Sequence, residues 1–72
     1  LKQPEVAISW YEKALEQQPN AGEIHFNLAS VLAEQERWAE AEPHVARALF
    51  LIPNWVQAEE LLRQVRSHLP GH

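Results

Sequence analysis

Apolar side chains recur at helical spacing in four segments of the chain, and each segment predicts one amphipathic α-helix. The predicted helices span about residues 4–17, 20–34, 39–51 and 54–69. Their apolar stripes consist of Ala7, Tyr11, Ala14 and Leu15; Ile24, Leu28, Val31 and Leu32, with Ala29 beside them; Ala41, Val45, Ala48, Leu49 and Ile52; and Ala58, Leu62, Val65 and Leu69. Because the connections are only two to four residues long, consecutive helices are expected to be antiparallel, and the predicted fold class is all-α.

Proline and asparagine mark the expected ends and beginnings of these helices. Pro19 stops the first helix, because the residue before a proline is pushed out of the helical region. Asn20 and Asn54 each have a glutamate or glutamine three residues later, a pattern typical of a capping box at a helix N-terminus,. Pro43 falls inside the third predicted helix, where we expect a bend or an irregular first turn.

Composition narrows the classes of function. The 72 residues carry a net charge of -4 and include no cysteine, so neither a disulfide nor a thiolate metal site stabilises the fold,. No basic cluster is present to follow a phosphate backbone, so no nucleic-acid partner is expected. No apolar run approaches the length of a membrane span, and none is predicted. No targeting segment is recognisable, which leaves the cytoplasm as the default location of an otherwise unknown compartment.

Small, apolar and turn residues also recur at an offset of 34 residues, the separation of Pro19 and Pro53. The matching pairs are Ala7 and Ala41, Ala14 and Ala48, Leu15 and Leu49, Pro19 and Pro53, Asn20 and Asn54, and Leu28 and Leu62. Such a series indicates an internal repeat. In this interpretation each proline ends the second helix of one repeat, and the following asparagine begins the first helix of the next.

The pattern resembles the tetratricopeptide repeat, a helix–turn–helix unit that stacks into a right-handed superhelix. The matching residues are Leu28, Ala29, Leu32, Ala41, Val45, Ala48 and Pro53, preceded by Ala7, Tyr11, Ala14 and Pro19 and followed by Leu62. The resemblance implies a single domain over residues 1–72, a superhelical stack of four helices that we expect to be a fragment of a longer helical-repeat protein. Residues 1–21 would be the second helix of a preceding repeat, 22–55 one complete repeat, and 56–72 a following first helix or a capping helix. His25 and Arg63 depart from the family pattern, which usually has a large apolar residue at the first position and a small one at the second.

The resemblance further implies a concave groove, lined by the first helices of the repeats, that holds an extended peptide or a partner helix. The groove residues would be Glu23, Phe26, Asn27, Ser30, Ala33, Glu34, Gln57, Glu60, Leu61 and Gln64. Asn27 matches an asparagine that some members use to hold a peptide carboxylate, but Gln57 and Leu61 occupy the positions of its basic partners. A carboxylate clamp is therefore not expected. The mixed acidic and apolar surface instead suits a protein or peptide with basic and hydrophobic groups.

A possible second interface consists of Trp10, Phe50, Ile52 and Trp55. The segment before Pro53 is apolar around the whole helix turn, whereas the segment before Pro19 is polar. One explanation is burial of Phe50, either under the chain around Leu69 or under Trp55. The alternative is self-association, in which an uncovered first helix and these apolar residues form a homo-oligomer.

Four histidines raise the question of metal binding or catalysis. His25 and His44 lie on different predicted helices, and Pro70 and Gly71 separate His68 from His72. No metal-ligand or nucleophile–base motif and no glycine-rich phosphate loop occurs. We therefore predict no catalytic residue, no metal site and no cofactor. The expected function is that of a non-catalytic protein-interaction module.

Overall fold

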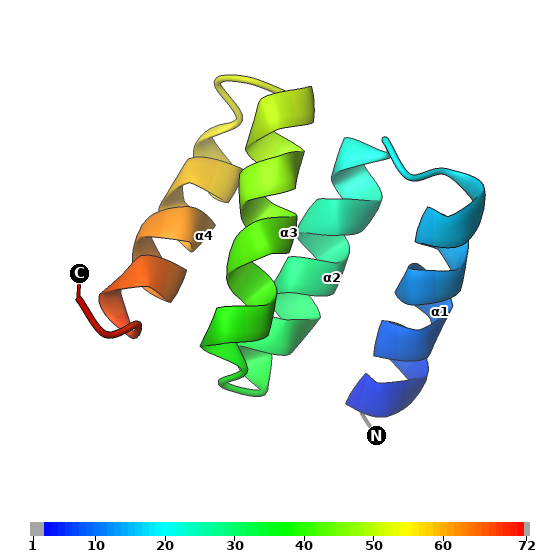
Figure 1. Ribbon diagram of the computed structural model, residues 1–72, viewed down its shortest axis with the longest axis horizontal. Helices are drawn as coiled ribbons and strands as arrows, with labels where there is room; N and C mark the ends of the chain where they lie inside the picture. Colours follow the sequence, from blue (N-terminus) through cyan, green and yellow to red (C-terminus); the bar gives the residue numbers. More distant parts are fainter. Residues whose placement is uncertain (1–2, 72) are drawn as a thin grey trace.

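A computed structural model describes residues 3–71, which form four α-helices and no strand. The helices are α1 (Pro4–Gln17), α2 (Gly22–Glu34), α3 (Trp38–Leu51) and α4 (Val56–Ser67). They stand side by side in chain order and alternate in direction (Figure 1), and α2 also contacts α4 beyond α3. This arrangement confirms the predicted all-α stack. Within residues 3–71, no helix has both the length and the apolar character needed to cross a membrane.

The core combines a few large aliphatic side chains with many alanines. Its largest fully buried side chains are those of Leu28, Val45 and Val65. Ala29, Ala41, Ala48 and Ala58 are also completely buried, each at 0% exposure. A methyl side chain at these positions lets neighbouring helix backbones approach closely, while the larger residues fill the remaining space. Ala29, Ala41 and Ala48, which match the repeat pattern in the sequence, are thus all buried.

In α1 the buried position was missed. Ile8, which lies outside the predicted stripe, is 5% exposed and is the buried residue of this helix. Tyr11 and Leu15 of the predicted stripe are half-buried and pack against the core cluster. The stripe was placed too far to one side because its spacing was read through Ala7 and Ala14, both of which are half-buried.

The two predicted capping boxes do not form. α2 and α4 begin two residues later than expected, with Ala21 and Trp55 as N-caps in extended backbone and with no side-chain cap bond. The Asn20 Oδ1 atom instead accepts a hydrogen bond from Arg47 Nη2 at 3.0 Å. Asn54 adopts a left-handed backbone with φ 67°, which asparagine tolerates better than most residues,. Both asparagines therefore belong to the turns between helices rather than to the helix starts.

The helix α3 continues through Pro43 as one uninterrupted element, so the predicted irregular first turn does not break the helix. Proline lacks the N–H that would bond to the carbonyl of Ala39, so α3 carries one internal hydrogen bond fewer. The helix α4 ends at Ser67, earlier than predicted, and Leu69 packs against the core after the helix has ended.

Gly22 allows the start of α2 to lie directly against the end of α3. A Cβ atom at Gly22 would lie 2.7 Å from Cδ1 and 2.9 Å from Cγ1 of Ile52. Both distances are shorter than real carbon contacts, so only glycine leaves room for Ile52 in this position. The half-buried Ile52 therefore packs directly on the start of α2.

Ion pairs link the helices at the surface. Arg37, just before α3, donates to both Glu40 oxygens at 2.8 and 2.9 Å and to Glu5 of α1 at 2.9 Å. The hydrogen bond from Arg37 holds the pKa of Glu40 below its usual range. Arg66 of α4 reaches Glu42 of α3 at 3.0 Å. Together these contacts connect α1, α3 and α4 across their exposed sides.

Candidate protein-binding groove

An aromatic pair links α2 to the start of α4. The rings of Phe26 and Trp55 lie with centroids 4.5 Å apart and planes tilted by 33°. Both side chains are half-buried and pack against the core cluster. The pair joins α2 to the N-cap of α4, and it leaves part of each ring accessible for an apolar contact.

Most of the predicted groove residues have polar side chains. Ser30 and Leu61 are half-buried, and the remaining polar positions are exposed: Glu23, Asn27, Glu34, Gln57, Glu60 and Gln64. Ala33 differs, because its side chain is 8% exposed and belongs to the hydrophobic core. Its inclusion as a groove contact is therefore corrected: the small side chain supports helix packing and adds almost no surface.

The charge of the predicted groove set is entirely negative. Three of the ten residues are glutamates, and none is lysine or arginine. Gln57 is exposed and Leu61 half-buried, so neither supplies the positive charge that a carboxylate clamp requires,. The chemistry of these side chains favours a cationic ligand segment over an anionic one.

The four residues of the predicted second interface have different neighbours. Trp55 lies against Phe26, and Ile52 packs on Gly22. Phe50 is 73% exposed, so the expected burial under Leu69 or Trp55 is wrong. Its ring is instead contacted by the Arg47 guanidinium, 5.1 Å from the ring centroid. A cation over an aromatic face explains how Phe50 remains at the surface.

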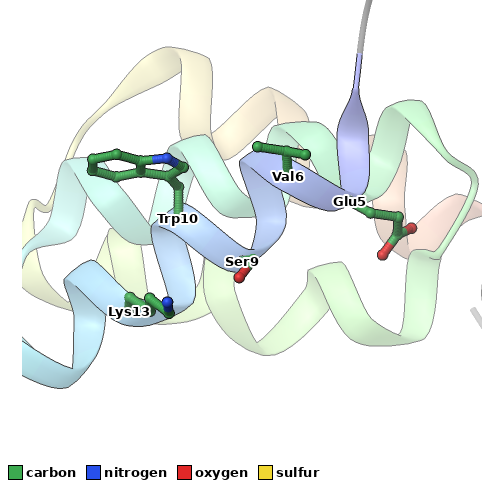
Figure 2. A pocket seen from close by; sticks show the side chains of 5 residues that line it. All are labelled: Glu5, Val6, Ser9, Trp10 and Lys13. Atoms are coloured by element: carbon green, nitrogen blue, oxygen red, sulfur yellow. The ribbon is translucent and has the colours of Figure 1, made fainter.

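Trp10 belongs to a different surface, the outer face of α1. There Val6 and Trp10, 52% and 72% exposed, border a hollow of about 530 Å³. Figure 2 shows both side chains on one side of the helix, with Glu5 and Lys13 towards opposite ends and Ser9 between them. Trp10 was a predicted interface residue, whereas Val6 was not, although its apolar character on a mostly polar helix face could have indicated it.

The structure brings together two histidines that were expected to stay apart. His25 of α2 and His44 of α3 lie with their Nδ1 atoms 3.1 Å apart and their ring centroids 5.3 Å apart. His25 Nε2 is 2.9 Å from the carbonyl oxygen of Pro19. His68 stacks on Trp38 instead, with centroids 4.0 Å apart. His72 lies outside the described residues.

The histidine pair is a structural contact between elements rather than a complete metal site. Across residues 3–71, no group of three or more histidine, cysteine, aspartate or glutamate residues is placed to hold a metal ion. Burial lowers the pKa of His44, and the nearby His25 lowers it further, while Glu12 of α1 acts in the opposite direction.

The paired antiparallel helices, the alanine contacts and the exposed face of α2 and α4 define a helical-repeat domain. A family model described as tetratricopeptide repeat matches residues 1–65. The chain belongs to the tetratricopeptide repeat family, whose members typically serve as non-catalytic modules for protein–protein interaction. Searches of curated proteins and of solved structures gave no match.

Proposed function

We propose that this chain is a non-catalytic scaffold module that binds a protein segment on the surface of α2 and α4. The bound segment would be an extended peptide or a helix carrying basic and apolar side chains. The observation that carries this proposal is the half-buried Phe26–Trp55 pair, which joins α2 to the start of α4, and all the charged residues of the predicted groove set are glutamates. The proposal keeps the division into residues 1–21, 22–55 and 56–72, and it needs neither a cofactor nor a catalytic group.

The apolar and the acidic side chains of the proposed groove would contribute differently to binding. Apolar contact with Phe26, Trp55 and Leu61 would supply most of the affinity, because burying apolar area is the main favourable term in association. Glu23 and Glu60 are exposed, so they would attract and orient a basic segment while adding little to affinity,. Binding should therefore weaken as salt is added, but it should not disappear.

Two adjacent glutamates allow a matched test. Glu60 belongs to the proposed groove, whereas Glu59 borders a separate hollow with Leu49 and Leu62. The probe is a synthetic peptide of alternating lysine and leucine, and its affinity is measured by calorimetry for wild type, Glu60→Gln and Glu59→Gln. We expect Glu60→Gln to weaken binding by about two- to fivefold, the range for an exposed charge pair. Glu59→Gln should bind as wild type does.

A peptide in which glutamate replaces lysine is the ligand control, and it should bind at least tenfold more weakly. Equal losses in the two variants would mean that only overall charge matters, and would contradict the proposed location. Equal affinity for the two peptides would contradict the proposed charge preference.

The outer face of α1 favours a second candidate function, self-association. Glu5 and Lys13 are each four residues from Ser9, on either side of the exposed Val6 and Trp10 (Figure 2). Two copies of α1 packed antiparallel about a two-fold axis at Ser9 would place each glutamate opposite a lysine of the second copy. Such a face is self-complementary in charge, as a two-fold interface requires.

A charge exchange tests this second candidate. In sedimentation across a concentration series, wild type should form dimers, and Lys13→Glu should weaken dimerisation by placing like charges opposite each other. The double variant Glu5→Lys/Lys13→Glu restores the complementarity between the two copies and should recover the dimer, although it also removes the bond from Arg37 to Glu5 and should lower the stability of each copy slightly,. A wild-type chain that remains monomeric at millimolar concentration rejects self-association and leaves the proposed groove unaffected.

A further inference from the structure

We propose that His25 and His44 form a proton-sensitive clasp that holds α3 against α2 and the turn between α1 and α2. The neutral pair keeps these three elements together, and acid weakens the contact. The clasp is independent of the proposed groove, because neither imidazole belongs to the groove residues.

The hydrogen-bond partners determine where the ring hydrogens lie. A carbonyl oxygen can only accept, so His25 Nε2 must carry the hydrogen that bonds to Pro19 at 2.9 Å,. In a neutral imidazole the other nitrogen is then an acceptor, so His25 Nδ1 offers a lone pair. The hydrogen in the 3.1 Å bridge must therefore come from His44 Nδ1. The two rings thus adopt opposite tautomers.

This bridge has room for one hydrogen only. If both rings are protonated, both Nδ1 atoms carry a hydrogen, and two N–H groups with positive charge face each other at hydrogen-bond distance,. Neither ring can then accept, so the attraction becomes repulsion. His25 is buried at 9% exposure, which limits how far water can screen the two charges,.

The surroundings of His44 act on its protonation in opposite directions. Glu12 faces His44 from α1 and favours its protonated form, whereas burial and His25 of α2 disfavour it more strongly. On α3 itself, Glu40 is bonded to Arg37, and Arg47 is bonded to Asn20. The net result is that the pKa of His44 lies below its ordinary value of 6.5.

The direction of the pH dependence follows from this lowered value. Below pH 6.5 the unfolded chain binds a proton at His44 that the folded chain resists, so acid favours unfolding,. The contribution of neutral His44 to folding stability is fully present above pH 6.5. It is lost as the pH falls through the lower pKa that His44 has in the folded chain,. Between the two values, each pH unit should reduce the folding equilibrium constant by up to about tenfold.

Nitrogen NMR of the histidine rings tests the geometry in the wild-type chain. At pH 8 we expect His25 to carry its hydrogen on Nε2 and His44 on Nδ1, the less common tautomer. If both rings carried the hydrogen on Nε2, two lone pairs would face each other and the clasp would be refuted. This measurement uses the wild-type chain, so its result does not depend on whether the substituted variants fold.

Urea unfolding between pH 8 and pH 5 tests the energetic consequence. His44→Asn keeps an amide donor near the position of Nδ1 but cannot titrate, so its stability should lose most of the wild-type dependence on pH. His68→Gln is the control, because His68 stacks on Trp38 and takes no part in the pair. We expect this control to keep the wild-type slope below pH 6.5. The clasp is overturned if His44→Asn keeps the full slope, or if His68→Gln removes it.

Discussion

Replacing Gly22 with alanine should test how closely α2 and α3 are packed. The added Cβ atom would lie 2.7 Å from Cδ1 and 2.9 Å from Cγ1 of Ile52, and 3.4 Å from Cβ of Leu51. Two of these contacts are too short to exist without movement. The Cδ1 atom of the half-buried Ile52 can move by rotation about χ2, whereas moving Cγ1 requires rotation about χ1, which also displaces Cγ2, or a shift of the helix end,.

Two opposing terms set the expected size of the effect. Forcing an extra methyl group into packed space costs about 1–3 kcal/mol. Alanine also restricts the unfolded chain relative to glycine, which returns about 0.4–1 kcal/mol. We therefore expect Gly22→Ala to lower the free energy of unfolding by about 1–2 kcal/mol, or the melting temperature by roughly 5–15 °C for a domain of this size.

A double-mutant cycle with Ile52→Val identifies the source of the loss. This second change removes Cδ1, the closest atom, and should cost about 0.5–1.5 kcal/mol by itself,. If the clash causes the loss, Gly22→Ala should cost at least about 0.5 kcal/mol less in the Ile52→Val background, as expected for residues in contact. Urea unfolding of the four proteins gives the coupling. Equal costs in the two backgrounds, or a stabilised single variant, would refute the reasoning.

Three further substitutions have distinct expected outcomes. Leu28→Ala empties a fully buried position and should cost about 2–5 kcal/mol, enough to leave a domain this small largely unfolded by circular dichroism at 25 °C,. Arg37→Gln removes the links to Glu5 and Glu40, so it should reduce stability slightly at low salt and not at about 1 M salt,. Phe50→Ser changes a 73% exposed side chain and should alter the free energy of unfolding by less than about 0.5 kcal/mol, whereas a large loss would reveal a packing role,.

The helices and most of the core could be predicted because burial follows local periodicity. Leu28, Val45 and Val65 fall on predicted stripes and are fully buried. The offset of 34 residues fixed the pairing of helices, since each small residue in one unit predicts a close contact in the next. The periodicity did not identify Ile8 as the buried residue of α1, because this helix presents apolar residues on more than one side.

The local motifs at the helix starts were misleading because distant contacts compete with them. Asn20 has the spacing of a cap, but its side chain bonds to Arg47, 27 residues away. Asn54 has the same spacing, yet the turn uses its tolerance of a left-handed backbone. A local sequence motif does not show whether a residue distant in the sequence will bond to the side chain that the motif assigns to the helix cap.

The histidine contact could not be predicted from the sequence for a similar reason. His25 and His44 are 19 residues apart, and their contact depends on the rotation of α2 and α3 about their axes. Phe50 shows the opposite case. Its apolar neighbours suggested burial, but Arg47 lies over its ring and the side chain remains in solvent.

The three tryptophans provide the most direct test of the central claim, that α2 and α4 form the binding surface. Trp55 lies beside Phe26 in the proposed groove, Trp10 on the outer face of α1, and Trp38 against His68. Each indole N–H gives its own NMR signal, which single tryptophan-to-phenylalanine variants would assign. On titration with the lysine–leucine peptide, the account predicts that the Trp55 signal shifts while those of Trp10 and Trp38 remain in place. A shift of Trp10 or Trp38 with Trp55 unchanged would contradict it.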